Sequence, residues 1–213
     1  MRHNLLAAQR EVWVAQQLDP SSARFNCGAF LDIGDVLEPS LVRRAVEQAL
    51  DEAQALRARF VEDGDEVVQL IEPAADDPLV RIDLRSADDP ITAARLWMDD
   101  QLGEPADLTR GPTYRHALIQ VEDSRYFLFF QFHHITLDGF GQALYLRRIA
   151  EIYSALVDDQ QPPENPFGSL DRLLTEEREY ERSGKKDADR AQLLEADRFL
   201  VDADDHRSRI AAT

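Results

Sequence analysis

The sequence contains a single cysteine, Cys27, among its 213 residues. One cysteine cannot close an internal disulfide or build a cysteine metal cluster, so a disulfide-stabilised scaffold and a thiolate zinc site are both excluded. A chain with so little cysteine fits a reducing compartment. Because no base is near Cys27 in the sequence, we interpret it as a small buried or half-buried residue and not as a nucleophile.

Positive charge is also scarce, since Lys and Arg total 24 against 41 Asp and Glu, which gives a formal net charge of -17. Such a surface repels nucleic-acid phosphates and anionic lipids, so we expect no nucleic acid and no membrane among the partners. No apolar run approaches the length of a membrane-spanning helix, and residues 1–10 lack the apolar core of a signal peptide. We therefore expect a cytoplasmic protein.

Several patterns that carry chemistry are missing. The sequence has no Gly-x-Ser-x-Gly elbow for a Ser-His-Asp hydrolase and no glycine-rich phosphate loop. His3, His116 and His206 are scattered without ligand spacing, so we expect no metal site. The chain also shows no internal repeat.

What is present is a mixed series of helix and strand patterns, with 44% hydrophobic residues to form one core. Periodicity predicts helices over residues 5–18, 39–56, 90–102, 140–157 and 169–200, and strands over 25–33, 56–61, 66–71, 80–84, 114–121 and 125–132. This order predicts a layered α/β (α+β) lobe, a mixed sheet flanked by helices. We assign residues 1–200 to the lobe and residues 201–213 to a polar, frayed tail. The strand over 125–132 is apolar on both faces, so we expect it to be central.

The most informative segment, residues 132–141, lies between that strand and the longest amphipathic helix. His133 and His134 are adjacent on extended chain, so they point to opposite faces, and only one can face a cleft. A histidine in a cleft accepts a proton near neutral pH, whereas the other is expected to be a hydrogen-bonded core residue. Asp138 at the helix start fits an N-cap. Gly139 permits a bend and a close backbone approach, and amides at a helix start can stabilise an oxyanion.

These residues resemble a known family. His133 to Gly139 match the HHxxxDG motif of nonribosomal peptide synthetase condensation domains, whose core is shared by chloramphenicol acetyltransferase-like acyltransferases. Residues 7–13 resemble the family's opening motif, and residues 110–112 fit its order. Residues 52–60 resemble its second motif, RHExLRTxF, with the Leu-Arg pair and the Phe retained. At the usual His, Glu and Thr positions, this chain has Ala53, Gln54 and Ala58.

The resemblance implies the N-terminal lobe of a chloramphenicol acetyltransferase-like fold, with a central tunnel between two lobes. It implies amide-bond formation between acyl and aminoacyl thioesters carried on the phosphopantetheine arms of peptidyl or aryl carrier proteins, with no cofactor bound by this lobe. It further implies that His134 is the catalytic base or orients the amine, and that Gly139 assists at the oxyanion. His133, Asp138 and Arg57 are then structural, with Asp138 pairing with an arginine. The similarity is greatest to condensation domains at the start of siderophore-type modules.

After residue 199 nothing resembles the family's later motifs. We therefore expect the C-terminal lobe and the neighbouring synthetase domains to be partners, and this chain alone to have little or no condensation activity. The alternatives are an epimerisation domain, a coenzyme A-dependent acyltransferase of the same superfamily, and a non-catalytic carrier-protein recognition module. Arg147 and Arg148 are candidates for a carrier-protein contact, although we favour an ordinary solvated helix face.

Overall fold

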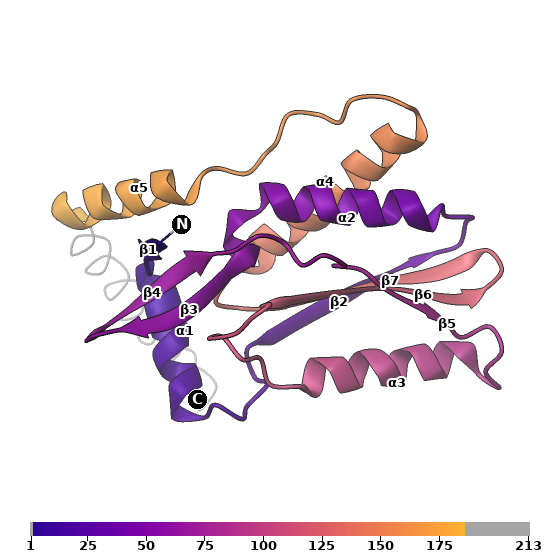
Figure 1. Ribbon diagram of the computed structural model, residues 1–213, viewed down its shortest axis with the longest axis horizontal. Coiled ribbons are helices and arrows are strands. Elements are labelled where there is room, and N and C mark those ends of the chain that lie inside the picture. The colour runs from indigo at the N-terminus through magenta and orange to yellow at the C-terminus, as the bar shows by residue number, and fades with distance from the viewer. Residues whose placement is uncertain (1, 186–213) are drawn as a thin grey trace, which may run out of the picture. The chain divides into compact units, whose positions relative to one another are not determined.

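The computed structural model describes residues 2–185 (Figure 1), and these fall into two units with the boundary between Leu170 and Asp171. The helices of the first unit are α1 (Ala7–Leu18), α2 (Pro39–Glu52), the 3-10 turn η1 (Gln54–Arg57), α3 (Pro90–Gly103) and α4 (Gly139–Val157). Its strands are β1 (Arg2–Asn4), β2 (Asn26–Ile33), β3 (Ala58–Asp63), β4 (Glu66–Ile71), β5 (Val80–Asp83), β6 (Tyr114–Glu122) and β7 (Arg125–His133). Helix α5 (Leu170–Arg182) begins at the boundary and runs into the second unit.

The first unit is built on a four-stranded mixed sheet with strand order β2-β7-β6-β5. Strand β7 pairs antiparallel with both β2 and β6, and β5 runs parallel to β6. The side chains of β7 from Tyr126 to His133 are all buried, so the prediction of a central strand with two buried faces is confirmed. The register places Asn26, the first residue of β2, beside His133.

Helices cover the two faces of this sheet. Helices α2 and α4 lie on one face, and α3 lies on the other (Figure 1). On α2, buried Val42, Val46 and Ala49 recur at helical spacing and turn one apolar stripe to the sheet. The layered fold predicted from the sequence is therefore observed.

A second, three-stranded antiparallel sheet has the order β1-β4-β3. Together with α1 it encloses a small apolar cluster in which Trp13 contacts Phe60, with 6.2 Å between ring centroids. Ile135, which follows the two histidines, is buried in the same cluster. The loop after β7 is therefore attached to the second sheet and to α1 as well as to its own strand.

The structure corrects some element boundaries. The helix predicted over residues 39–56 ends at Glu52, and the chain continues as the 3-10 turn η1. Because side chains three residues apart align in a 3-10 helix, Leu56 lies on the same side as Ala53, and both are buried. Strand β1 was not predicted, because three residues are too short to show alternation. Helix α5 ends at Arg182, and the rest of the predicted helix, like the tail over residues 201–213, lies outside the described residues.

The prediction that Arg148 lies on an exposed helix face is also wrong. Arg148 is neither a carrier-protein contact nor part of a solvated face, because its side chain is only 2% exposed. Its guanidinium donates to both carboxylate oxygens of Glu52 on α2, at 2.6 and 2.9 Å, and to the Pro163 carbonyl at 2.8 Å. Its neighbour Arg147 is 75% exposed and pairs with Glu151 one turn further along α4. Arg148 thus joins α4 to α2.

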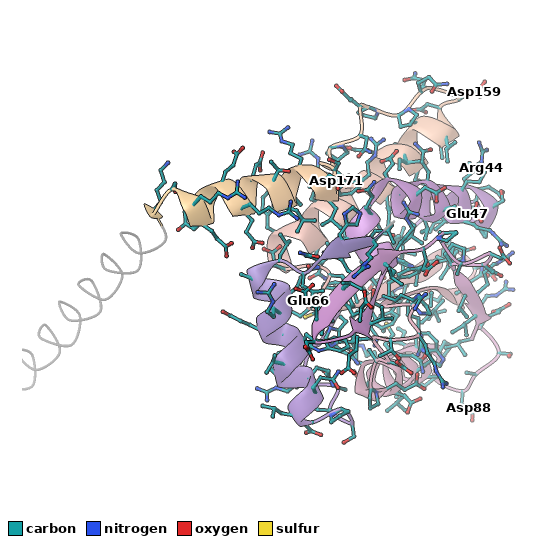
Figure 2. The ribbon with its side chains drawn as sticks, turned by 60° about the vertical axis from the view of Figure 1, so that its left-hand side comes forward. Arg44, Glu47, Glu66, Asp88, Asp159 and Asp171 are labelled. Carbon is teal, nitrogen blue, oxygen red and sulfur yellow. The ribbon has the colours of Figure 1, made fainter. Side chains whose placement is uncertain are left out.

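The acidic excess lies at the surface. Figure 2 shows Arg44 and Glu47 projecting outward from α2, and Asp88 and Asp159 at the periphery of the first unit. Within the described residues, no helix is long and apolar enough to cross a membrane.

Candidate active site

The two histidines lie where β7 ends and the segment leading to α4 begins. His133 is the last residue of β7, and α4 starts at Gly139, so five residues connect them. The His134 N–H donates to the Phe25 carbonyl at 2.8 Å, which extends the β2–β7 pairing by one residue. This is the end of a central strand, where loops are held by a rigid scaffold.

His133 is buried and fully hydrogen-bonded. Its Nδ1 accepts from the Ile135 N–H at 3.2 Å, so the ring proton is on Nε2, which donates to Gln16 Oε1 at 3.2 Å. Burial, followed by the proximity of His134, lowers the pKa of His133 to about 4. The imidazole is therefore neutral at pH 7.

His134 points the other way and is exposed, as strand alternation predicts. Its Nδ1 lies 2.8 Å from the Leu137 carbonyl oxygen, which can only accept, so Nδ1 carries the proton. In the neutral form of the ring Nε2 is then the unprotonated nitrogen, and no described hydrogen bond occupies it. A lone pair in this position can accept a hydrogen bond or a proton from an incoming amine.

Asp138 caps α4. Its Oδ1 accepts from the Gly141 N–H at 2.7 Å, and its backbone is extended, as at an N-cap. Among residues 2–185, no arginine pairs with Asp138 in the structure.

Gly139 and Gly141 differ in what surrounds them. A Cβ on Gly139 would meet no atom within 4 Å, and the backbone there is not in the left-handed region, so the chain itself does not require glycine. A Cβ on Gly141 would lie 3.0 Å from Leu137 Cδ2 and 3.3 Å from Asp138 Oδ1. The sequence did not reveal this role of Gly141. In the described residues, the N–H groups of Gly139 and Phe140 meet no acceptor, so both remain available at the start of α4.

Arg57 makes its contacts elsewhere. Its guanidinium donates to the Glu72 carbonyl at 2.9 Å and to the Asp51 carbonyl at 3.0 Å. These bonds join the end of α2 to the chain just beyond β4. No described hydrogen bond or ion pair brings Arg57 to the histidine loop.

Two residues of α1 were missed by the sequence reasoning. Gln16 accepts from the His133 ring, and Gln9 Nε2 donates to the Ile135 carbonyl at 3.2 Å. Gln9 belongs to the opening motif quoted above, which was the available signal for it. No local pattern identifies Gln16, because its partner is 117 residues away.

Other candidate chemistry is not found. Within residues 2–185 no group of His, Cys, Asp or Glu is arranged to hold a metal ion. Cys27 is half-buried, and burial raises the pKa of its thiol, which disfavours the thiolate. A hollow of about 540 Å³ lies between α3 and β2 and is not lined by either site histidine, so we do not regard it as the reaction site.

The comparisons with known proteins agree on one family. A family model, the condensation domain, matches residues 2–191. The chain is 37% identical to isonitrile lipopeptide synthase of Streptomyces coeruleorubidus and 36% identical to a dimodular nonribosomal peptide synthase of Bacillus subtilis. Each match covers 93% of this chain, but 13% and 8% of those proteins. Enterobactin synthase component F of Escherichia coli O157:H7 is 34% identical over 84% of this chain and 14% of that protein.

Solved structures give the same result. The starter condensation domain of rhizomide synthetase RzmA is similar with a TM-score of 0.83 and 36% identity, over 92% of this chain and 48% of that one. The first condensation domain of the CDA synthetase is similar with a TM-score of 0.80 and 33% identity, over 90% and 49%. The chain spans about half the length of these solved domains and a small part of the curated synthases.

Proposed function

This chain belongs to the condensation-domain family, and from that premise we propose that it supplies the histidine side of a site that forms amide bonds between carrier-bound thioesters. The observation that carries the proposal is the hydrogen bond from His134 Nδ1 to the Leu137 carbonyl, because in the neutral ring it leaves Nε2 as the unprotonated nitrogen of an exposed residue.

The proposed reaction is an acyl transfer from sulfur to nitrogen. The amine of the acceptor substrate, held by its hydrogen bond to His134 Nε2, attacks the carbonyl carbon of the donor thioester. A carbon–nitrogen bond forms and the carbon–sulfur bond breaks. The proton lost by the amine passes to Nε2 and from there to the departing phosphopantetheine thiolate, so the imidazole ends neutral.

The start of α4 suits the oxyanion of the tetrahedral intermediate. Its first-turn amides carry partial positive charge, and those of Gly139 and Phe140 have no acceptor in the described residues. The open space at Gly139 leaves room for a substrate next to these donors. Asp138, by capping the helix, keeps the Gly141 N–H out of this role.

The chain spans about half the length of the solved condensation domains. We infer that the opposite wall of the site comes from the other half of a condensation domain, because the solved domains are about twice as long as this chain. The proposed partners are therefore that second lobe, peptidyl or aryl carrier proteins and neighbouring synthetase domains. His133, Asp138 and Arg57 are proposed to hold the structure and not to touch substrate.

The test measures amide product by intact-protein mass spectrometry from defined donor and acceptor carrier-protein thioesters. The full chain is assayed alone and with a second lobe, as the unsubstituted protein, His134→Ala and His134→Gln. We expect product only with the second lobe, and a loss of about 100-fold or more in His134→Ala, as for removal of a general base. Near-normal activity of His134→Gln would indicate orientation of the amine without proton transfer.

Three other outcomes would contradict the proposal. Carrier binding without product in any mixture would support a recognition module. Exchange of the substrate α-proton without amide formation would support epimerisation. Transfer from a free coenzyme A thioester at the rate of the carrier-bound donor would support a coenzyme A-dependent acyltransferase.

A further inference from the structure

We propose that Gln9 and Gln16 of α1 are positioning residues that fix the orientation of His134 by holding the residues on either side of it. The inference rests on the proposed function of His134. Neither glutamine touches the exposed Nε2, so their effect is on where that atom lies and not on the chemistry itself.

Gln16 holds the residue before His134. Its Oε1 accepts from the His133 ring at 3.2 Å, and its Nε2 donates to the carbonyls of Asp19 and Ser22 at 3.1 and 3.0 Å. These last two bonds fix the orientation of the amide, because its NH₂ group must face the carbonyls. The oxygen therefore faces the histidine ring. Gln16 is only 3% exposed, so water cannot readily replace it.

Gln9 holds the residue after His134. Its Nε2 donates to the Ile135 carbonyl and to Gln69 Oε1, each at 3.2 Å, while its Oε1 accepts from the Leu6 N–H at 3.0 Å. Gln69 in turn donates to the Asn4 carbonyl at 2.8 Å. The Ile135 peptide is thus tied to the start of α1 and to the central strand of the second sheet. Gln9 is 6% exposed.

The two contacts act together because of their spacing. Gln9 and Gln16 are seven residues apart, which places them two turns apart on one side of α1. One straight helix therefore fixes two points, the His133 ring and the Ile135 carbonyl, and His134 lies between them. Its own ring bond to Leu137 spans only three residues, so it depends on the segment that Gln9 secures. A displacement of about 1 Å in a reacting group can lower a rate by about 100-fold.

The first test is a tautomer measurement on the unsubstituted chain. Two-bond proton–nitrogen NMR spectra of the histidine rings distinguish Nδ1–H from Nε2–H in each imidazole. We expect His133 as the Nε2–H form and His134 as the Nδ1–H form. A His134 ring that exchanges freely between both tautomers in the unsubstituted chain would overturn the proposal, whether or not any variant folds.

The second test changes the glutamines. Gln9→Met and Gln16→Met keep the side-chain length but remove the polar atoms, and Gln17→Met is the matched control, because Gln17 is an exposed neighbour on the same helix. With the second lobe and thioester substrates present, we expect kcat to fall by about 10- to 100-fold in the two site variants with KM within about twofold. We expect no change in Gln17→Met. In the folded variant, Gln9→Met should also show His134 in both tautomers.

The outcomes separate this proposal from the function it rests on. If His134 keeps its single tautomer and kcat in both folded variants, positioning by α1 is wrong while the proposed function stands. If no protein forms amide but the tautomer of His134 responds to Gln9→Met, the proposed function is wrong and the positioning is supported. Equal loss of kcat in the Gln17→Met control would overturn the assignment to these two side chains.

Discussion

Replacing Arg148 with methionine removes the cationic partner of Glu52 from a nearly dry position between α4 and α2. The methionine keeps most of the aliphatic volume, so the main loss is electrostatic. Glu52 keeps a hydrogen bond from Gln48 at 3.0 Å but loses two from Arg148, and the Pro163 carbonyl loses its donor. Breaking a buried pair in this way costs about 3–5 kcal/mol, and we expect the lower end because the Glu52 side chain is still 15% exposed.

The loss of unfolding free energy in Arg148→Met should depend on pH. Burial raises the pKa of Glu52, but the hydrogen bonds from Arg148 and Gln48 and the charge of Arg148 outweigh burial and hold it below the ordinary 4.5. This lowered pKa stabilises the fold above about pH 4.5 and ceases to do so as the pH falls through the folded value. Without Arg148, burial should raise the pKa above 4.5, so the folded variant takes up a proton before the unfolded chain does. The difference between the two proteins should therefore shrink from pH 7 toward pH 4.

Urea unfolding followed by tryptophan fluorescence at several pH values measures this difference directly. Arg147→Met is the matched control, since Arg147 is exposed and its pair with Glu151 is worth less than about 0.5 kcal/mol. A deficit in Arg148→Met as small as that of the control would refute the reasoning, and so would a deficit that stays constant between pH 7 and pH 4.

Two further predictions concern the loop and the core. Gly141→Ala should lower the free energy of unfolding by up to about 1 kcal/mol, because crowding of Leu137 Cδ2 and Asp138 Oδ1 by the new methyl group outweighs the roughly 1 kcal/mol that alanine gains over glycine in a helix. Gly139→Ala, which meets no atom of this chain, should change it by less than about 0.5 kcal/mol, and equal thermal shifts in the two variants would contradict this. Burial lowers the pKa of His116 from 6.5 to about 4, so between these values the unfolded chain binds a proton that the folded chain does not. His116 alone should therefore lower the free energy of unfolding by up to about 1.4 kcal/mol for each pH unit of acidification in this range. In His116→Gln, the free energy of unfolding measured in urea should decrease less steeply as the pH falls.

The sequence was sufficient for the elements that depend on local periodicity. The paired strands β6 and β7, the long helix α4 and the opposite facing of His133 and His134 follow from alternation and helical spacing alone. The HHxxxDG match then identified the family, which the comparisons confirm. The roles of His134 and Gly139 remain proposals.

The sequence did not predict contacts between residues that lie far apart along the chain. Arg147 and Arg148 look alike as neighbours, and only Glu52, 96 residues earlier, makes one of them a buried residue. Gln16 is one of two adjacent glutamines, and only the fold shows which of them meets His133. The tight space at position 141 arises from the side chains of Leu137 and Asp138, which would lie 3.0 and 3.3 Å from a Cβ there. Periodicity in a sequence indicates which face of a helix or strand is buried, but not which residue each side chain contacts. Such pairs are therefore seen only in the three-dimensional structure.

The attachment of α1 to the end of β7 also has a consequence for the order of folding. Strands β6 and β7 are neighbours in sequence and can form a hairpin early, whereas β2 and α1 reach β7 only by closing loops of roughly a hundred residues. During synthesis, α1 leaves the ribosome long before the strand that it must meet. Until β7 and Ile135 are made, the two glutamine amides can form only their local bonds, to Leu6, Asp19 and Ser22, and the atoms that later meet the histidine loop face water. The histidine loop should therefore be among the last parts of the lobe to take its final geometry, after the hairpin that carries it has formed.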